Sequence, residues 1–95
     1  MTAAGWRLKP LCSLHWRQFG DEWVAFDEGS GDTHRMDTLS AVVLMCLGES
    51  PCDLADLSSQ VAVETDLPEG EELSRALASV LETYTGEGLI ERTAS

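Results

Sequence analysis

Basic residues are scarce in this chain of 95 residues. It carries six Lys or Arg against 17 Asp or Glu, which gives a formal net charge of −11 at pH 7. The imbalance is uneven, since residues 1–37 hold four basic and six acidic residues, whereas residues 38–95 hold two and eleven. Because Lys and Arg contacts to phosphate supply most of the affinity of nucleic-acid-binding proteins, we expect no nucleic acid among its partners. The same field repels an anionic membrane surface, so we expect no membrane partner either.

Long apolar runs and secretory features are also lacking. The run at residues 42–47 is far shorter than the roughly 18 residues that a membrane span needs, so it predicts a core helix. No basic-then-apolar signal opens the sequence. The three cysteines are an odd number without C-x-x-C spacing, unlike a secreted disulfide framework. We therefore expect a cytoplasmic protein whose thiols are reduced.

The usual motifs of enzymes and metal sites are missing too. The glycine-rich stretch at residues 29–31 lacks the lysine and the following helix of a phosphate-binding loop. Cys12 and His15 do not have the spacing of a zinc knuckle. The adjacent acids Glu71 and Glu72 fall on a predicted helix, where neighbours in sequence do not share a face. We expect a protein that is not an enzyme, with no catalytic residue, metal or cofactor.

What the sequence does contain is enough apolar surface for one small domain. Hydrophobic residues make up 43% of the chain, a share typical of folded proteins. A chain of this length buries roughly 60–65% of the surface that its unfolded form exposes, which suffices for a two-layer core. We expect a single domain over residues 1–95, with residues 1–5 frayed.

Three short stretches have the composition of β-strands. Residues 14–19, 22–27 and 33–36 are rich in aromatic, β-branched or alternating residues, and turn-forming residues separate them. Strands in series with tight turns predict an antiparallel meander. Residues 6–8 also alternate, but Pro10 bars a continuous central strand through this region.

The periodicity then changes to that of helices. Asp37 is a predicted N-cap for a helix over residues 38–47, with Gly48 as its stop. Asp53 is predicted to begin a second helix, and residues 63–65 are predicted to form a loop after it.

A third and longest helix is predicted over residues 66–84. Asp66 and Glu69 have capping-box spacing, and Gly86 and Gly88 follow as stop signals. Apolar residues recur along one face of this helix, at Leu73, Ala76, Leu77, Val80, Leu81 and Tyr84. After it, residues 88–91 are predicted to be extended. The predicted fold class is therefore α+β, a three-stranded antiparallel sheet followed by three helices.

Four sequence features, in this order and spacing, resemble a known family. They are the strands LHWRQF and EWVAFD, the turn and strand GSGDTHRMD, and the closing GLIE, within a region of resemblance that covers residues 6–91. The chain resembles the PqqD-like peptide chaperones, which serve as leader-peptide recognition elements for ribosomally made, modified peptides. It is most similar to the variety called the HPr-rel-A system PqqD family peptide chaperone. The resemblance implies a winged helix-turn-helix-like fold.

The resemblance also implies a function. Relatives bind the leader of a precursor peptide and present it to a modifying enzyme, and the name of this variety implies a neighbouring protein related to HPr kinase. In them, the peptide adds as a strand to the third strand of the sheet, beside the third helix. Such β-augmentation uses the unpaired N–H and C=O groups of an edge strand.

Mapped onto this sequence, the resemblance predicts a binding site on one strand and one helix. On the helix, Ala76 and Ser79 are small enough to leave room for a guest side chain, and Arg75 is placed to pair with an acidic residue of the peptide. On the strand, His34 and Arg35 point to opposite faces. The predicted peptide-binding residues are Asp32, Thr33, His34, Arg35, Met36, Arg75, Ala76, Ser79 and Val80.

Two other functions stay open on the sequence alone. A winged-helix transcription factor has the same strand and helix content, but the net charge of −11 and a last helix with Arg75 as its only basic residue disfavour it. An assembly subunit without peptide binding would use the same exposed strand edge to form a homodimer or a complex.

Overall fold

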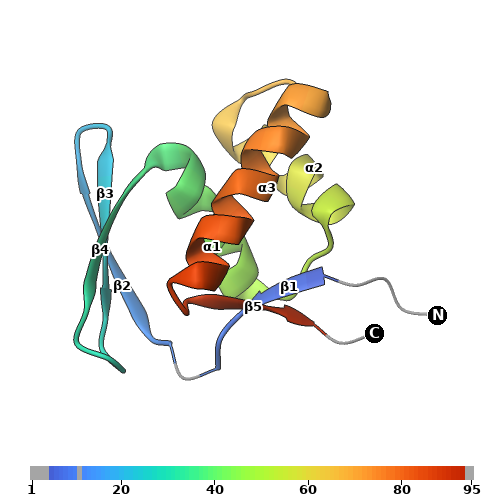
Figure 1. Cartoon of the computed structure of the whole chain (residues 1–95). Coiled ribbons are helices and arrows are strands. Elements are labelled where there is room, and N and C mark those ends of the chain that lie inside the picture. The colour runs from blue at the N-terminus through green and yellow to red at the C-terminus, as the bar shows by residue number, and fades with distance from the viewer. Residues whose placement is uncertain (1–4, 11, 94–95) are drawn as a thin grey trace.

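The computed structural model describes residues 5–10 and 12–93, and its strands and helices separate into a sheet on one side and a helical layer on the other (Figure 1). This arrangement confirms the α+β class, with a three-stranded antiparallel sheet and three helices. The frayed segment predicted at residues 1–5 lies outside the described residues except for Gly5, which is part of a strand. The elements are β1 (Gly5–Leu8), β2 (Leu14–Phe19), β3 (Glu22–Asp27), β4 (Thr33–Asp37), α1 (Thr38–Glu49), α2 (Leu54–Thr65), α3 (Glu71–Gly86) and β5 (Ile90–Thr93).

The predicted meander is present as the sheet β2-β3-β4. The β2–β3 hairpin turns at Gly20, whose φ of +62° is a left-handed value that glycine adopts without steric cost. Alternation places Ala25 in the core, while Phe26 points to the exposed face. Trp16 and Trp23 meet edge to face on the inner side, with their ring centroids 6.2 Å apart.

A second sheet, which the sequence did not predict, pairs β1 with β5 in antiparallel fashion. It crosses below the helices in Figure 1 and brings the two ends of the described chain together. Trp6 belongs to this sheet, where it stacks under the guanidinium of Arg92 at 5.2 Å and exchanges two backbone hydrogen bonds with Cys52. Gly5 is required here because a Cβ atom would come within 2.6 Å of the Cys52 carbonyl oxygen.

Helix α1 is the centre of the core. Asp37 caps it as predicted, since its carboxylate accepts a hydrogen bond of 2.9 Å from the Ser40 N–H. The helix is apolar on several faces because β1, β3, β4, α2 and α3 all pack against it. The predicted stop at Gly48 is wrong, since α1 continues to Glu49 and ends at Ser50.

The boundary between α2 and α3 differs from the prediction. Asp53 caps α2 as expected, but α2 continues through the predicted loop at residues 63–65. Asp66 then closes α2 in the left-handed conformation, with φ of +58°, so the predicted capping box and helix start at Asp66 are wrong. Helix α3 begins after Gly70 and has no side-chain cap.

The apolar face predicted for α3 faces the core. Four of its six residues, Leu73, Leu77, Leu81 and Tyr84, are buried, and Ala76 and Val80 at its edge are half-buried. The largest fully buried side chains come from all three helices and from β5: Leu44, Leu57, Leu77, Leu81, Ile90, Val43 and Val61. Among the described residues, no helix is long and apolar enough to cross a membrane.

Candidate functional site: the free edge of β4

Strand β4 lies at one edge of its sheet, and no described residue pairs with its outer side. The Asp27 N–H donates a 2.8 Å hydrogen bond to the Asp32 carbonyl just before the strand, which makes these two residues a hydrogen-bonded pair. Bonded and non-bonded pairs alternate along an antiparallel ladder. Thr33 and Arg35 therefore direct their backbone N–H and C=O groups away from β3, toward the open edge.

The side chains of β4 alternate between two environments, as predicted for His34 and Arg35. Met36 belongs to the core with 7% of its surface exposed, so its role at the site is to anchor the strand. His34 points inward, and its Nδ1 lies 3.6 Å from a carboxylate oxygen of Glu87 after α3. Arg35 points outward and reaches the carboxylate of Glu22 at 3.8 Å.

The turn that precedes β4 is held by a buried carboxylate. Asp27 accepts hydrogen bonds from the N–H groups of Ser13 and Gly29 and from the hydroxyl of Ser30. The Ser13 N–H contributes most to lowering the pKa of Asp27, and the other two donors add to it against the opposing effect of burial. Because Asp32 donates its N–H to the Ser30 hydroxyl, Asp32 belongs to this turn and not to the open edge.

Helix α3 presents a flank of small and apolar side chains toward the first turn of α1. Ala76 is half-buried and, together with Leu39, lines a hollow of about 210 Å³ that begins two residues beyond the end of β4. Leu67 and Pro68 of the α2–α3 loop close this hollow. Val80 packs against the core one turn further along the same flank.

Two predicted residues of α3 lie farther from this flank. Ser79 is exposed, about 60° around the helix axis from Ala76, given the helical rotation of about 100° per residue. Arg75 is about 100° from Ala76 on the same side of the helix as Ser79, and pairs with Glu71 at 3.1 Å on the exposed face. The structure therefore brings Ala76 and Val80 to the site and leaves Arg75 outside it.

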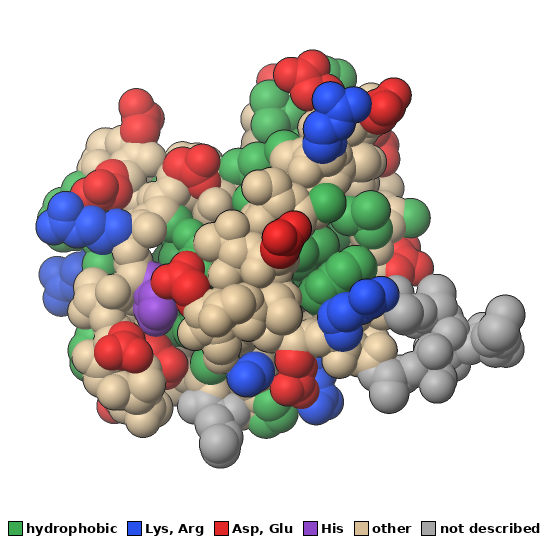
Figure 2. All heavy atoms as spheres, viewed as in Figure 1, with side chains coloured by type: hydrophobic (Ala, Val, Ile, Leu, Met, Phe, Trp, Pro, Cys, Tyr) green, Lys and Arg blue, Asp and Glu red, His purple; other side chains and the backbone are tan. Residues whose placement is uncertain are grey.

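Acidic side chains surround the site. Glu72 borders the hollow, Glu87 stands beside His34, and Glu22 and Asp37 line a surface depression that includes Arg35. Figure 2 shows acidic side chains distributed over this face of the molecule and fewer basic ones. A ligand at this site would meet a surface of net negative charge.

Sequence reasoning missed Glu87, Leu39 and the α2–α3 loop as parts of this site. Glu87 was detectable, because it falls eleven residues after Ala76 and seven after Val80, on the same helical line. The loop residues carried no such signal, since their position depends on where α2 ends.

The described residues offer little reactive chemistry. Burial raises the pKa of the Cys12 and Cys46 thiols, so both stay protonated at neutral pH, whereas a nucleophilic cysteine needs a lowered pKa. No group of three or more His, Cys, Asp or Glu side chains within residues 5–10 and 12–93 is arranged to hold a metal ion. What this site can supply is backbone hydrogen bonding and shape.

Comparisons of this chain with protein-family models, with curated proteins and with solved structures give no match.

Proposed function

We propose that this chain is a non-catalytic, PqqD-like adaptor with a winged-helix-like fold, which captures a precursor peptide by β-strand addition and presents it to a modifying enzyme. The observation that carries the proposal is the open edge of β4, where Thr33 and Arg35 offer two N–H and two C=O groups. A five-residue strand is about 17 Å long, which matches a short extended peptide segment.

Main-chain bonds alone do not select a sequence, so selectivity comes from side-chain pockets. The hollow at Leu39 and Ala76 begins two residues beyond the end of β4, so a peptide extending past Asp37 would place an apolar side chain there. Because Glu72 and Glu87 flank the path and Arg75 is engaged with Glu71, the favoured peptide carries a basic residue. This differs from the acidic peptide residue that we expected to pair with Arg75.

The test is a titration of isotope-labelled protein with peptides encoded beside its gene, followed by backbone amide shifts. We expect shifts at Thr33–Asp37 and along the Ala76–Val80 flank of α3. No shift with any of these peptides at about 1 mM, where even roughly −4 kcal/mol of binding is visible, would contradict the adaptor function.

A proline scan of β4 makes the test specific for strand addition. Thr33→Pro removes an N–H that faces the open edge at the first strand position, where proline is tolerated, so we expect a folded protein with about fivefold to tenfold weaker peptide binding. His34→Pro is the matched control, because it removes an N–H that bonds to β3 and should destabilise the sheet itself. Unchanged peptide affinity in a folded Thr33→Pro variant would exclude the β4 edge.

The same edge would serve self-association if the chain were an assembly subunit. Sedimentation of the unmodified protein and of the Thr33→Pro variant separates the two functions. If the mass of the unmodified protein doubles as its concentration rises, and the mass of the Thr33→Pro variant does not, a β4–β4 homodimer is favoured over peptide capture.

A further inference from the structure

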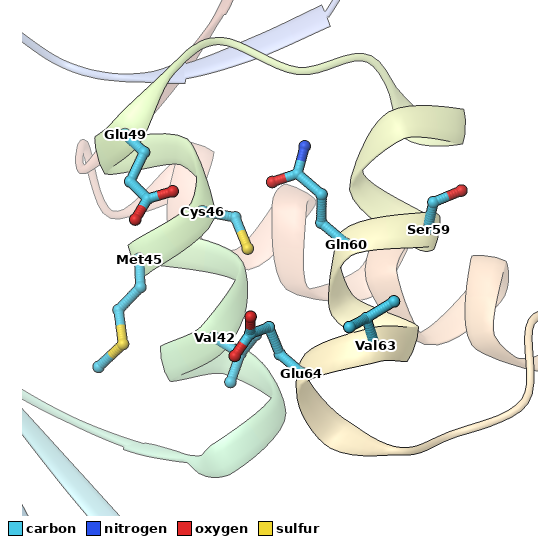
Figure 3. A pocket seen from close by; sticks show the side chains of 8 residues that line it. All are labelled: Val42, Met45, Cys46, Glu49, Ser59, Gln60, Val63 and Glu64. Carbon is cyan, nitrogen blue, oxygen red and sulfur yellow. The ribbon is translucent and has the colours of Figure 1, made fainter.

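A second concave surface lies between α1 and α2 and shares no residue with the β4 edge. Four residues of each helix line a groove of about 470 Å³: Val42, Met45, Cys46 and Glu49 from α1, and Ser59, Gln60, Val63 and Glu64 from α2. In Figure 3 the side chains of Cys46 and Glu64 point into the space between the two helices.

The apolar part of this groove is only partly covered by the fold. Val63 is 80% exposed, more than the exposed side chains of Phe19, Phe26 and Leu67. Val42 and Met45 are half-buried beside it, and Met adapts its shape to different partners. The Cys46 thiol stays protonated, because burial, followed by the effects of Cys52, Glu49 and Glu64, raises its pKa. The groove therefore presents an apolar floor without a reactive group.

The groove carries a carboxylate on each of its two helices. Glu49 and Glu64 line it, and the Ser59 hydroxyl, also in the lining, donates a 3.1 Å hydrogen bond to the carboxylate of Glu69 in the α2–α3 loop. The sequence around it is strongly biased, since residues 38–74 contain eight Asp or Glu and no Lys, Arg or His. The groove thus has an apolar floor between carboxylates that have no basic neighbour on their own helices.

We propose that this groove binds an amphipathic, basic helix of a partner protein. The lining residues extend over about two turns of each helix, so the two helices form the walls of a short trough, a shape used in helix-in-groove recognition. An apolar row on the guest helix covers Val42, Met45 and Val63, and Lys or Arg beside that row complements the carboxylates. A second copy of this chain would bring the same acidic rim against itself, and nucleic acid would be repelled by it. This site is separate from β4 and does not depend on peptide capture there.

The test uses isotope-labelled full-length chain and a synthetic peptide of about 14 residues made of Leu, Lys and Ala, with Leu at i, i+3, i+4 and i+7 positions. Its control is a scrambled peptide of the same composition without helical periodicity. At about 0.15 M salt we expect amide shifts on both α1 and α2 around the groove, and at least about tenfold tighter binding of the periodic peptide.

Variants separate groove binding from general attraction to an acidic protein. Val63→Ser changes a side chain that makes little contact with the rest of the fold, and we expect it to lower the affinity for the periodic peptide at least about fivefold. Phe19→Ser removes an exposed apolar side chain on β2, 61% exposed, and should leave binding unchanged. Three results would overturn the proposal: equal binding of both peptides, no binding at about 1 mM, or a concentration-dependent dimer that Val63→Ser abolishes. Shifts confined to Thr33 and Arg35 would report the β4 site instead.

Discussion

Asp27 shows how one side chain stabilises the turn that presents β4. Its folded pKa is lowered, first by the Ser13 N–H, so the ionised form stabilises the folded state at neutral pH. This stabilisation is present above about pH 4, the ordinary pKa of an aspartate. It is lost as the pH falls further, through the lowered pKa of Asp27 in the folded state. We predict that Asp27→Asn lowers the urea midpoint at pH 7 and reduces the loss of stability below about pH 4. Asp21→Asn, at an exposed turn, is the control; the same pH profile in wild type and Asp27→Asn would contradict the prediction.

Ser58 is expected to destabilise the fold, because its buried hydroxyl has no hydrogen-bond partner among the described residues. An unsatisfied buried polar group costs free energy, and Ala is also the better helix former at this position in α2. We predict that Ser58→Ala raises the free energy of unfolding by about 1 kcal/mol. Ser59→Ala is the matched control, since the exposed Ser59 hydroxyl bonds to Glu69 and its loss should change stability little. A destabilised Ser58→Ala variant in urea denaturation would show that the hydroxyl has a partner in solution.

At the scale of elements, α2 depends on its N-cap. The Asp53 carboxylate accepts the Asp56 N–H at 2.8 Å and satisfies one of the free donors of the first turn. We predict that Asp53→Ala destabilises the protein by about 1 kcal/mol, whereas Asp56→Ala, which leaves the capping bond intact, costs less than about 0.5 kcal/mol. Equal effects of the two substitutions on thermal unfolding would contradict the role of the cap.

Local patterns predicted most elements because each depends on neighbours in sequence. Alternation located β2, β3 and β4, and a period of 3.6 found the buried face of α3 and with it Ala76 and Val80. The start of α3 was misplaced because aspartate suits both an N-cap and the left-handed end of a helix, and Asp66 adopts the second.

Non-local features escaped prediction. The pairing of β1 with β5 joins residues such as Leu8 and Ile90, and no pattern within either segment specifies its partner. The hollow beside Ala76 was equally hidden, because the α2–α3 loop that closes it is positioned by where α2 ends. The open edge of β4 follows from the first of these features, since β5 pairs with β1 and does not extend the sheet β2-β3-β4.

At the scale of the whole molecule, the net charge of −11 opposes compaction. The ion pairs on the surface, such as Arg75–Glu71 and Arg35–Glu22, are largely exposed and contribute little against this repulsion. We predict that raising NaCl from about 0.02 M to about 0.5 M increases the urea midpoint, because salt screens repulsion between carboxylates. A triple variant, Asp56→Asn, Glu64→Gln and Glu72→Gln, should show a smaller increase; a midpoint that falls with salt would contradict the argument.

The β1–β5 sheet also determines how the fold responds to mechanical force. Gly5 is paired with Thr93, so a pull applied outward at these two residues acts on the same end of the antiparallel pair. The ladder then opens one residue pair at a time, like a zipper, and the load is never shared among all its hydrogen bonds at once. Once the pair has opened, Ile90 leaves the core together with β5. A pull on Gly5 and Thr93 therefore meets the unzipping geometry of β1–β5 before it reaches the core.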